Sequence, residues 1–136
     1  MPTGVLASVH VAVNYATMFP VTDMFERGLP TPYDEAVLDL VAMIPAGTVL
    51  AYGDVARLLG RGGPRQVGAV MSKFGAGVPW HRVIRADGCA PLGHESEARR
   101  RWAQEGTPMT GDGLRVRMNA ARWPGPGESA TEATRA

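Results

Sequence analysis

The sequence has little from which a metal site, a disulfide or a membrane span could be built. Its single cysteine, Cys89, excludes an internal disulfide and a cysteine metal cluster. The three histidines lack the cysteine or carboxylate spacing of a metal site, so we expect neither metal nor cofactor. No stretch approaches the roughly 20 apolar residues of a membrane helix. Residues 5–13 are mildly apolar but follow no basic residue, so we expect no secretory signal and a cytoplasmic protein.

Lysine is also scarce, because 13 of the 14 basic residues are arginine. The net charge of +1 conceals an uneven distribution along the chain. Residues 1–56 carry one basic and six acidic side chains, whereas residues 57–122 carry twelve basic and five acidic ones. A basic half favours a polyanionic partner, although a solvated basic face would give the same count.

The composition fits one working domain at residues 30–123, mainly α-helical with a small β element. Residues 1–29 show no sustained periodicity and are predicted to be a poorly ordered extension, and residues 124–136 a disordered tail. A first helix begins at Thr31-Pro32, where threonine caps and proline suits the first turn, and it ends at residues 45–47. A short apolar stretch, residues 48–51, leads to the next helix.

Two further short helices are predicted at residues 52–59 and 64–74, separated by a glycine-bearing loop. In the second, apolar residues at positions 67, 70, 71 and 74 form one buried stripe, and small or polar side chains lie opposite. This arrangement is what a DNA-binding helix-turn-helix requires, but any buried helical hairpin shows the same pattern. Gly68 and Ala69 would let the backbone approach DNA closely.

The last third of the domain is predicted to contain a helix, a turn and a strand. The helix spans residues 95–105 and ends at Gly106. Its run Arg99-Arg100-Arg101 is typical of a solvated face and is not assigned to DNA. Residues 110–113 predict a hairpin turn, and the alternation in residues 114–118 predicts a half-exposed strand with a basic outer face. Tyr33 and Trp102 are predicted to be core residues.

The run Pro79-Trp80-His81-Arg82-Val83-Ile84 makes the sequence specific. It resembles the Pro-Cys-His-Arg-Val active-site signature of the O6-alkylguanine-DNA alkyltransferases, with Trp80 at the position of the alkyl-accepting cysteine. That replacement marks the alkyltransferase-like proteins. The resemblance covers most of residues 33–123, and further motifs match in order at residues 44–47, 51–56, 64–71, 105–106 and 122–123. It implies a winged helix-turn-helix-like domain of the alkyltransferase C-terminal type.

The resemblance also implies how such a domain works. Proteins of this group bind the minor groove through the helix-turn-helix and rotate the alkylated guanine into a pocket. Arg65 matches the arginine that fills the vacated gap, and Tyr52 matches the tyrosine that promotes rotation. The expected DNA contacts are Tyr52, Arg65, Gln66, Gly68, Ala69, Ser72 and Lys73. The expected lesion pocket consists of Tyr52, Pro79, Trp80, His81, Arg82, Val83 and Glu105.

His81 and Glu105 match the pair that relays a proton in true transferases, and here we expect a structural hydrogen bond between them. No catalytic residue is expected, because dealkylation needs a thiolate and an indole offers no comparable nucleophile. We further expect a monomeric, nucleoid-associated protein. Its expected partners are double-stranded DNA containing O6-alkylguanine and nucleotide excision repair proteins. Two alternatives stay open: an active transferase that uses Cys89, and a general helix-turn-helix DNA-binding protein.

Three positions depart from the family pattern. Ala51 stands where a serine or threonine commonly precedes the tyrosine, so the second helix is expected to lack a side-chain cap. The loop of residues 72–78 is short and could reshape the pocket rim. The second arginine that the group places after the signature has no counterpart in residues 90–94, where His94 is the one candidate substitute.

Overall fold

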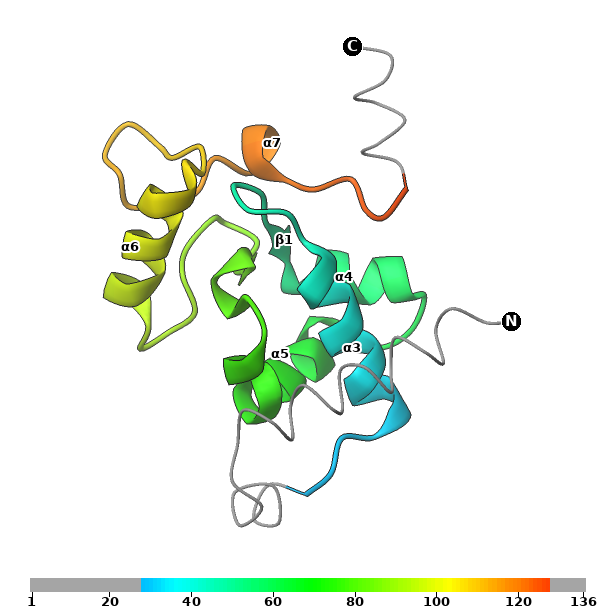
Figure 1. Cartoon of the computed structure of the whole chain (residues 1–136). Coiled ribbons are helices and arrows are strands. Elements are labelled where there is room, and N and C mark those ends of the chain that lie inside the picture. Colours follow the sequence, from blue (N-terminus) through cyan, green and yellow to red (C-terminus); the bar gives the residue numbers. More distant parts are fainter. Residues whose placement is uncertain (1–27, 128–136) are drawn as a thin grey trace.

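The computed structural model describes residues 28–127, which form a mainly helical unit with one small sheet (Figure 1). The predicted extension and the predicted tail lie mostly outside the described residues, so both stay predictions. The elements, in chain order, are α3 (Pro32–Met43), β1 (Leu50–Ala51), α4 (Tyr52–Leu59), α5 (Pro64–Phe74), the 3-10 turns η1 (Gly75–Gly77) and η2 (Trp80–Arg82), β2 (Val83–Ile84), α6 (Glu95–Glu105) and α7 (Met118–Ala121).

Helix α3 begins where the sequence predicts. The Thr31 hydroxyl accepts the Asp34 N–H at 3.1 Å, and the Asp34 carboxylate accepts the Thr31 N–H at 2.9 Å. This reciprocal pair satisfies two backbone donors that would otherwise lack partners in the first turn. Val37, Leu38 and Val41 lie on the buried face of the helix.

Helices α4 and α5 form the predicted pair with its glycine-bearing turn. As expected, Ala51 provides no side-chain cap for α4. Asp54 instead accepts the Ala51 N–H at 2.9 Å and the Arg122 Nε at 2.9 Å, which ties the start of α4 to the end of the domain. Gly60 ends α4 with a φ of +77°. Helix α5 spans the predicted residues, and its side chains at positions 67, 70 and 74 are buried.

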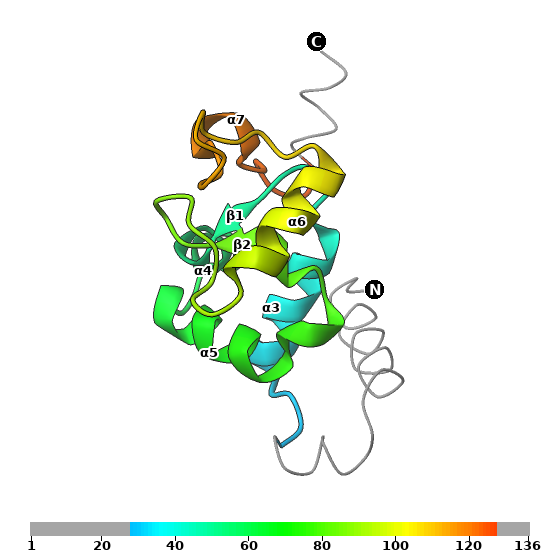
Figure 2. The ribbon, with the colours of Figure 1, turned by 90° about the vertical axis from the view of Figure 1, so that its left-hand side faces the viewer.

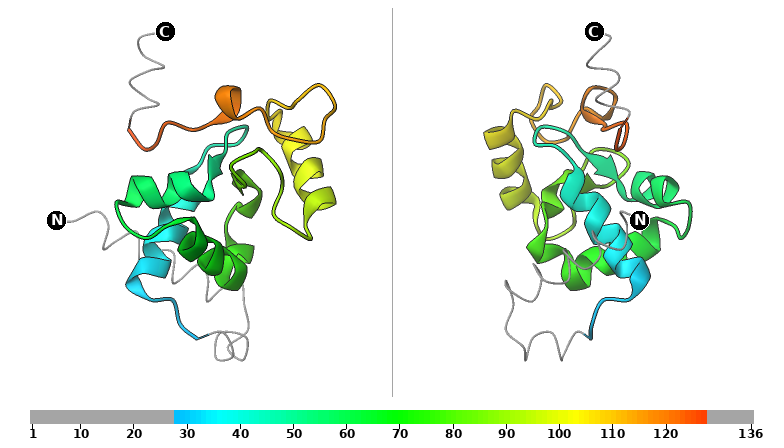
Figure 3. Two further views of the ribbon diagram at one scale, coloured as in Figure 1. Left: turned by 180° about the vertical axis from the view of Figure 1, so that it is seen from behind. Right: turned by 45° about the vertical axis from the view of Figure 1, so that its right-hand side comes forward.

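The two-stranded parallel sheet separates two groups of buried side chains. Leu50 and Val83, which are paired in register, face the core made by α3, α4 and α5. Ile84 and the neighbouring Val49 face a second core under α6, which contains the fully buried Trp102. Opposite views place α6 on one side of the sheet and α3 to α5 on the other (Figure 3). The sheet therefore fixes the helix pair relative to α6.

The prediction of a strand at residues 114–118 is wrong. The turn at residues 110–113 forms, and Asp112 accepts the Leu114 N–H within it. Only one bridge follows, between Met109 and Val116, and the chain then enters α7. Helix α7 brings Ala121 and, just beyond it, Trp123 into the cores, and this burial outweighs the weak alternation of the sequence. Tyr33 packs against the first core while remaining partly exposed.

Within residues 28–127, every helix is too short or too polar to cross a lipid bilayer.

Two glycines with a positive φ angle allow a matched test of how closely the turn after β2 packs against Val116. Gly88 has a φ of +90°, and an added Cβ would lie 2.3 Å from the Val116 carbonyl oxygen. Gly60 has a φ of +77° with open space around it. We expect Gly60→Ala to lower the free energy of unfolding by about 1 kcal/mol through backbone strain alone. Gly88→Ala should cost about 2–4 kcal/mol, since the clash adds to the same strain. Urea denaturation measures both, and equal losses would contradict this account of the turn at residues 85–88, which follows β2 and is called the β2 turn below.

Candidate nucleic-acid interface

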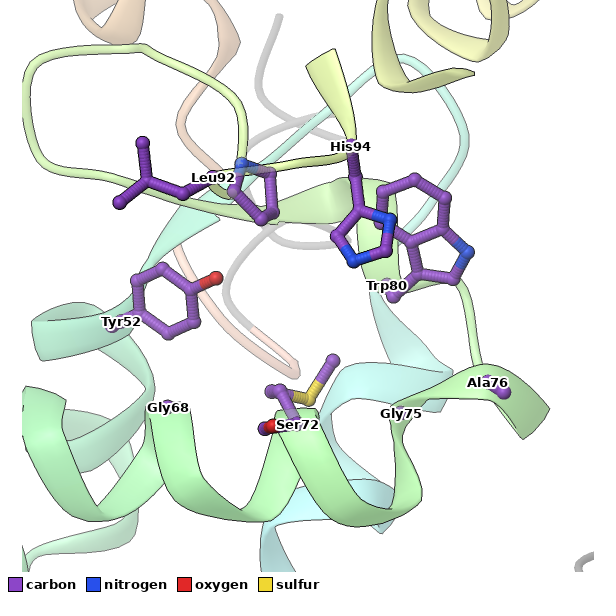
Figure 4. Close-up of a pocket in the computed structure, with 10 residues that line it drawn as sticks. Tyr52, Gly68, Ser72, Gly75, Ala76, Trp80, Leu92 and His94 are labelled. Carbon is purple, nitrogen blue, oxygen red and sulfur yellow. The ribbon is translucent and has the colours of Figure 1, made fainter. Parts of the chain in front are cut away.

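A cavity of about 410 Å³ opens between α4, α5 and the segment that precedes α6 (Figure 4). Side chains of all three parts face it, as the close-up shows for Tyr52 of α4, Ser72 of α5 and His94, and Trp80 of η2 lies beside His94. Most of the side chains around it are apolar or small. Its lining residues are Tyr52, Gly68, Met71, Ser72, Gly75, Ala76, Trp80, Pro91, Leu92 and His94.

Trp80 forms one wall of this cavity and is held from several directions. The His94 ring lies 5.4 Å from the indole, centroid to centroid, and the His81 ring meets it edge-on at 5.9 Å. The Arg101 guanidinium of α6 lies 5.5 Å from the indole centroid, within the range of a cation–π interaction. These contacts fix the indole as a wall of the pocket.

Behind the wall, the Glu105 carboxylate joins three segments of the chain. It accepts hydrogen bonds from His81 Nε2 at 2.7 Å, from Arg82 Nη2 at 2.6 Å and Nε at 3.1 Å, and from the Gly47 N–H at 3.2 Å. Arg82 also donates to the Ile44 carbonyl at 2.8 Å. The predicted His81–Glu105 hydrogen bond is confirmed.

The charges of this cluster follow from its contacts. Partial burial alone would raise the pKa of Glu105, but the hydrogen bonds from Arg82, His81 and Gly47 outweigh it and bring the pKa to about 2. Burial lowers the pKa of His81 below its usual 6.5, although the hydrogen bond to Glu105 opposes this effect. His81 is therefore neutral near pH 7, and its Nε2–H donates to the carboxylate. His81 Nδ1 is buried and has no hydrogen-bond partner among residues 28–127.

The structure divides the predicted site residues into three groups. Tyr52, Gly68, Ser72 and Trp80 line the same cavity. The other predicted DNA contacts lie along the exposed side of α5, where Gln66, Ala69 and Lys73 border a shallow groove beside α3. The remaining predicted pocket residues do not line the cavity: His81, Arg82 and Glu105 form the cluster behind Trp80, Val83 is fully buried in the core, and Pro79 only precedes the wall.

Sequence reasoning missed most of the far rim of the cavity. Pro91 and Leu92 line it, and the Leu92 side chain is 75% exposed. His94, considered only as a substitute for an absent arginine, also lies in the lining. The sequence offered no clear signal for this rim, because a single exposed leucine in a loop is common on protein surfaces.

Tyr52 keeps its proton at neutral pH. Burial raises the pKa of its hydroxyl, and the nearby positive charge of Arg85 only partly offsets the effect. The hydroxyl is thus available as a hydrogen-bond donor in the lining of the cavity.

Cys89 does not line the cavity beside Trp80. It borders a separate hollow between the β2 turn and α6. Partial burial and the neighbouring Asp87 carboxylate raise the pKa of its thiol, which disfavours the thiolate. Among residues 28–127 no group of histidine, cysteine and carboxylate side chains could hold a metal ion.

Replacing Glu105 tests the cluster. Glu105→Gln removes the charge that faces Arg82 and His81, and we expect it to lower the free energy of unfolding at pH 7 by about 3 kcal/mol. Because the folded pKa of Glu105 is about 2 and its usual value is 4.5, its contribution is complete above pH 4.5 and is lost as pH falls toward 2. Urea denaturation between pH 7 and pH 2 should therefore show a smaller acid-dependent loss in the variant than in the wild type.

The matched control is Glu97→Gln on the same helix, which loses only exposed ion pairs with Arg100 and Arg101. We expect this change to cost less than about 1 kcal/mol. Equal losses in the two variants, or an unchanged acid dependence in Glu105→Gln, would contradict the assigned role of the cluster.

Comparisons with known proteins agree with this geometry. Residues 32–107 match the family model "6-O-methylguanine DNA methyltransferase, DNA binding domain". The "DNA base-flipping protein" of Escherichia coli is 35% identical over 115 residues, which cover 81% of this chain and 87% of that protein. A methylated-DNA–protein-cysteine methyltransferase of Methanothermobacter thermautotrophicus is 45% identical over 62 residues, which cover 44% of this chain and 35% of that protein.

The fold matches a solved complex as well. The crystal structure of S. pombe Atl1 with damaged DNA containing O6-carboxymethylguanine aligns with a TM-score of 0.58 and 32% identity. The alignment covers 67% of this chain and 94% of Atl1. The chain therefore belongs to the family defined by the DNA-binding domain of 6-O-methylguanine DNA methyltransferase, among its alkyltransferase-like members.

Proposed function

We propose that this protein binds O6-alkylguanine in duplex DNA without repairing it and thereby marks the lesion for nucleotide excision repair. In this proposal the α4–α5 pair enters the minor groove, and the alkylated base rotates into the cavity beside Trp80. The names of two relatives, a DNA base-flipping protein and a protein crystallised on damaged DNA, support this assignment. We further propose that the protein acts as a monomer in the cytoplasm, at the nucleoid.

The position of Trp80 carries the proposal. Transfer of an alkyl carbon from the guanine oxygen needs an activated thiolate beside the base. In this cavity an indole forms the wall next to the His81–Glu105 pair, and the lining residues include no cysteine. The aromatic face of Trp80 offers stacking and apolar contact instead. The site therefore retains the means to hold a base and lacks the group that would accept its alkyl substituent.

Base rotation needs a replacement for the base that leaves the stack. Unstacking costs a few kcal/mol, and an inserted side chain lowers that cost. Arg65 is exposed in the first turn of α5, close in sequence to Gly68, which lines the cavity. Its planar guanidinium suits both stacking and phosphate neutralisation. We assign Arg65 to the vacated gap and Tyr52 to the phosphate of the rotated nucleotide.

The transferase alternative is less well supported. It requires Cys89 to attack the base, but Cys89 borders a different hollow and has a raised thiol pKa. The general DNA-binding alternative leaves the 410 Å³ cavity and its aromatic wall without a role. Lesion recognition uses the helix pair, the cavity and the indole together.

Lesion preference tests the proposed function. We expect the protein to bind a duplex with one O6-methylguanine at least about tenfold more tightly than the matched unmodified duplex, a difference of about 1.4 kcal/mol. Fluorescence anisotropy at several salt concentrations measures both affinities. Arg65→Ala should weaken binding by roughly 1–3 kcal/mol, because the vacated gap is no longer filled.

Arg57→Ala is the matched control for Arg65→Ala. Arg57 is an exposed arginine of α4 whose side chain pairs with Asp54, and its loss should change affinity by much less. Equal affinity for the two duplexes at every salt concentration would contradict lesion recognition. An Arg65→Ala effect no larger than that of the control would contradict the role assigned to Arg65.

A further inference from the structure

A second hollow, of about 330 Å³, lies next to the segment whose residues Pro91 and Leu92 line the Trp80 cavity, which is called the base cavity from here on. Arg85 of the β2 turn, Arg99 of α6 and Arg115 of the following loop all border it, and we call it the arginine hollow. The segment between β2 and α6 projects on the same side of the molecule as α4 and α5 (Figure 2). No function discussed above uses these three arginines.

Backbone hydrogen bonds hold together the two segments that carry Arg85 and Arg115. The Val116 N–H donates to the Gly88 carbonyl at 2.9 Å, and the Arg85 N–H donates to the Cys89 carbonyl at 3.0 Å. Gly88 approaches Val116 so closely that no Cβ would fit between them. These contacts bind the β2 turn to the loop that carries Arg115, so two of the three guanidinium groups are held over one hollow.

Two carboxylates, those of Glu95 and Asp112, also border the hollow. Hydrogen bonds from other groups lower the pKa of Asp87, Glu95 and Asp112, and the charges of Arg85, Arg99 and Arg115 respectively help to lower it. Asp87 accepts the Cys89 N–H, Asp112 accepts the Leu114 N–H, and Glu95 accepts the Gly93 N–H. Within residues 28–127, the side chains of the three arginines make no hydrogen bond or ion pair with another residue. The neighbouring Arg100 and Arg101, by contrast, pair with Glu97. Guanidinium groups that border one concavity and have no hydrogen-bonded partner suit a phosphate, which accepts several hydrogen bonds at once.

Consecutive residues of one segment border the hollow and the base cavity. Ala90 borders the arginine hollow, while Pro91 and Leu92 line the base cavity. The charge of Arg85 also acts on the hydroxyl of Tyr52 in the lining of that cavity. A DNA strand that delivers a base to the cavity would therefore pass with its backbone near the hollow.

We propose that the arginine hollow binds backbone phosphates of the same duplex, as a second anchoring site beside the base cavity. This inference rests on the proposed function, because it takes DNA as the ligand of the neighbouring cavity. It extends the DNA contacts from α4 and α5 to the β2 turn, the first half of α6 and the loop at residues 110–116. Such contacts add affinity that is independent of sequence and of the lesion.

The salt dependence of DNA binding tests the hollow. Each phosphate contact contributes about 0.9 to the slope of log K against log salt. A variant combining Arg85→Gln, Arg99→Gln and Arg115→Gln should lower the slope by up to about 2.7, and each single change by up to about 0.9. The loss should be the same on O6-methylguanine and unmodified duplexes, so that the lesion preference is unchanged. The corresponding triple lysine variant should retain most of the slope, since it keeps the charges.

Arg100→Gln provides the matched control, because it removes one arginine of the same helix that already pairs with Glu97. The proposed site would be overturned if the triple glutamine variant kept the wild-type slope of log K against log salt. It would also be overturned if Arg100→Gln lowered that slope as much as a single change in the hollow does. Calorimetric titration with inorganic phosphate separates the two sources of the ligand: phosphate binding to the free protein together with an unchanged DNA slope would assign the hollow to a small anion. A wild type without lesion preference whose slope still falls in the triple variant would overturn only the proposed function.

Discussion

The hydrogen bonds to the Glu105 carboxylate hold together the parts on which the site depends. They connect the end of α6 to the η2 turn through His81 and Arg82, and to the loop before β1 through Gly47. Trp102, on the preceding turn of α6, adds a hydrogen bond from its indole N–H to the His81 carbonyl at 2.7 Å. The η2 turn is thereby fixed against α6, and Trp80 takes its place as a cavity wall.

The same cluster is consistent with the proposed recognition of a lesion without chemistry. The resemblance implies that His81 and Glu105 relay a proton from a cysteine in true transferases. In this chain the hydrogen bond between them remains at 2.7 Å, yet the residue beside them is Trp80. The pair has a structural role because its hydrogen bonds join three segments of the chain, and under the proposed function no cysteine beside it supplies a proton. With Trp80 at this position, the cavity wall is still supported from behind by the Glu105 cluster.

The parts that the sequence predicted well are those with local signals. Thr31 and Pro64 mark the starts of α3 and α5, and Gly60 and Gly106 mark the ends of α4 and α6, because caps and left-handed glycines act within one turn. The two strands have only two residues each and leave no periodic pattern to detect. The alternation in residues 114–118 misled because burial beyond the turn, at Ala121, decides the path of the chain. The cavity rim and the arginine hollow depend on how distant loops meet, which spacing along the chain does not encode.

The central claim is that this cavity holds an alkylated base and leaves it chemically unchanged. The most direct measurement incubates an excess of the purified full chain with a duplex whose O6-methylguanine carries a radiolabelled methyl group, followed by chromatography of the bases and counting of the protein. We predict that all of the O6-methylguanine is recovered and that the protein carries no label. Regeneration of unmodified guanine with label on the protein would contradict the account.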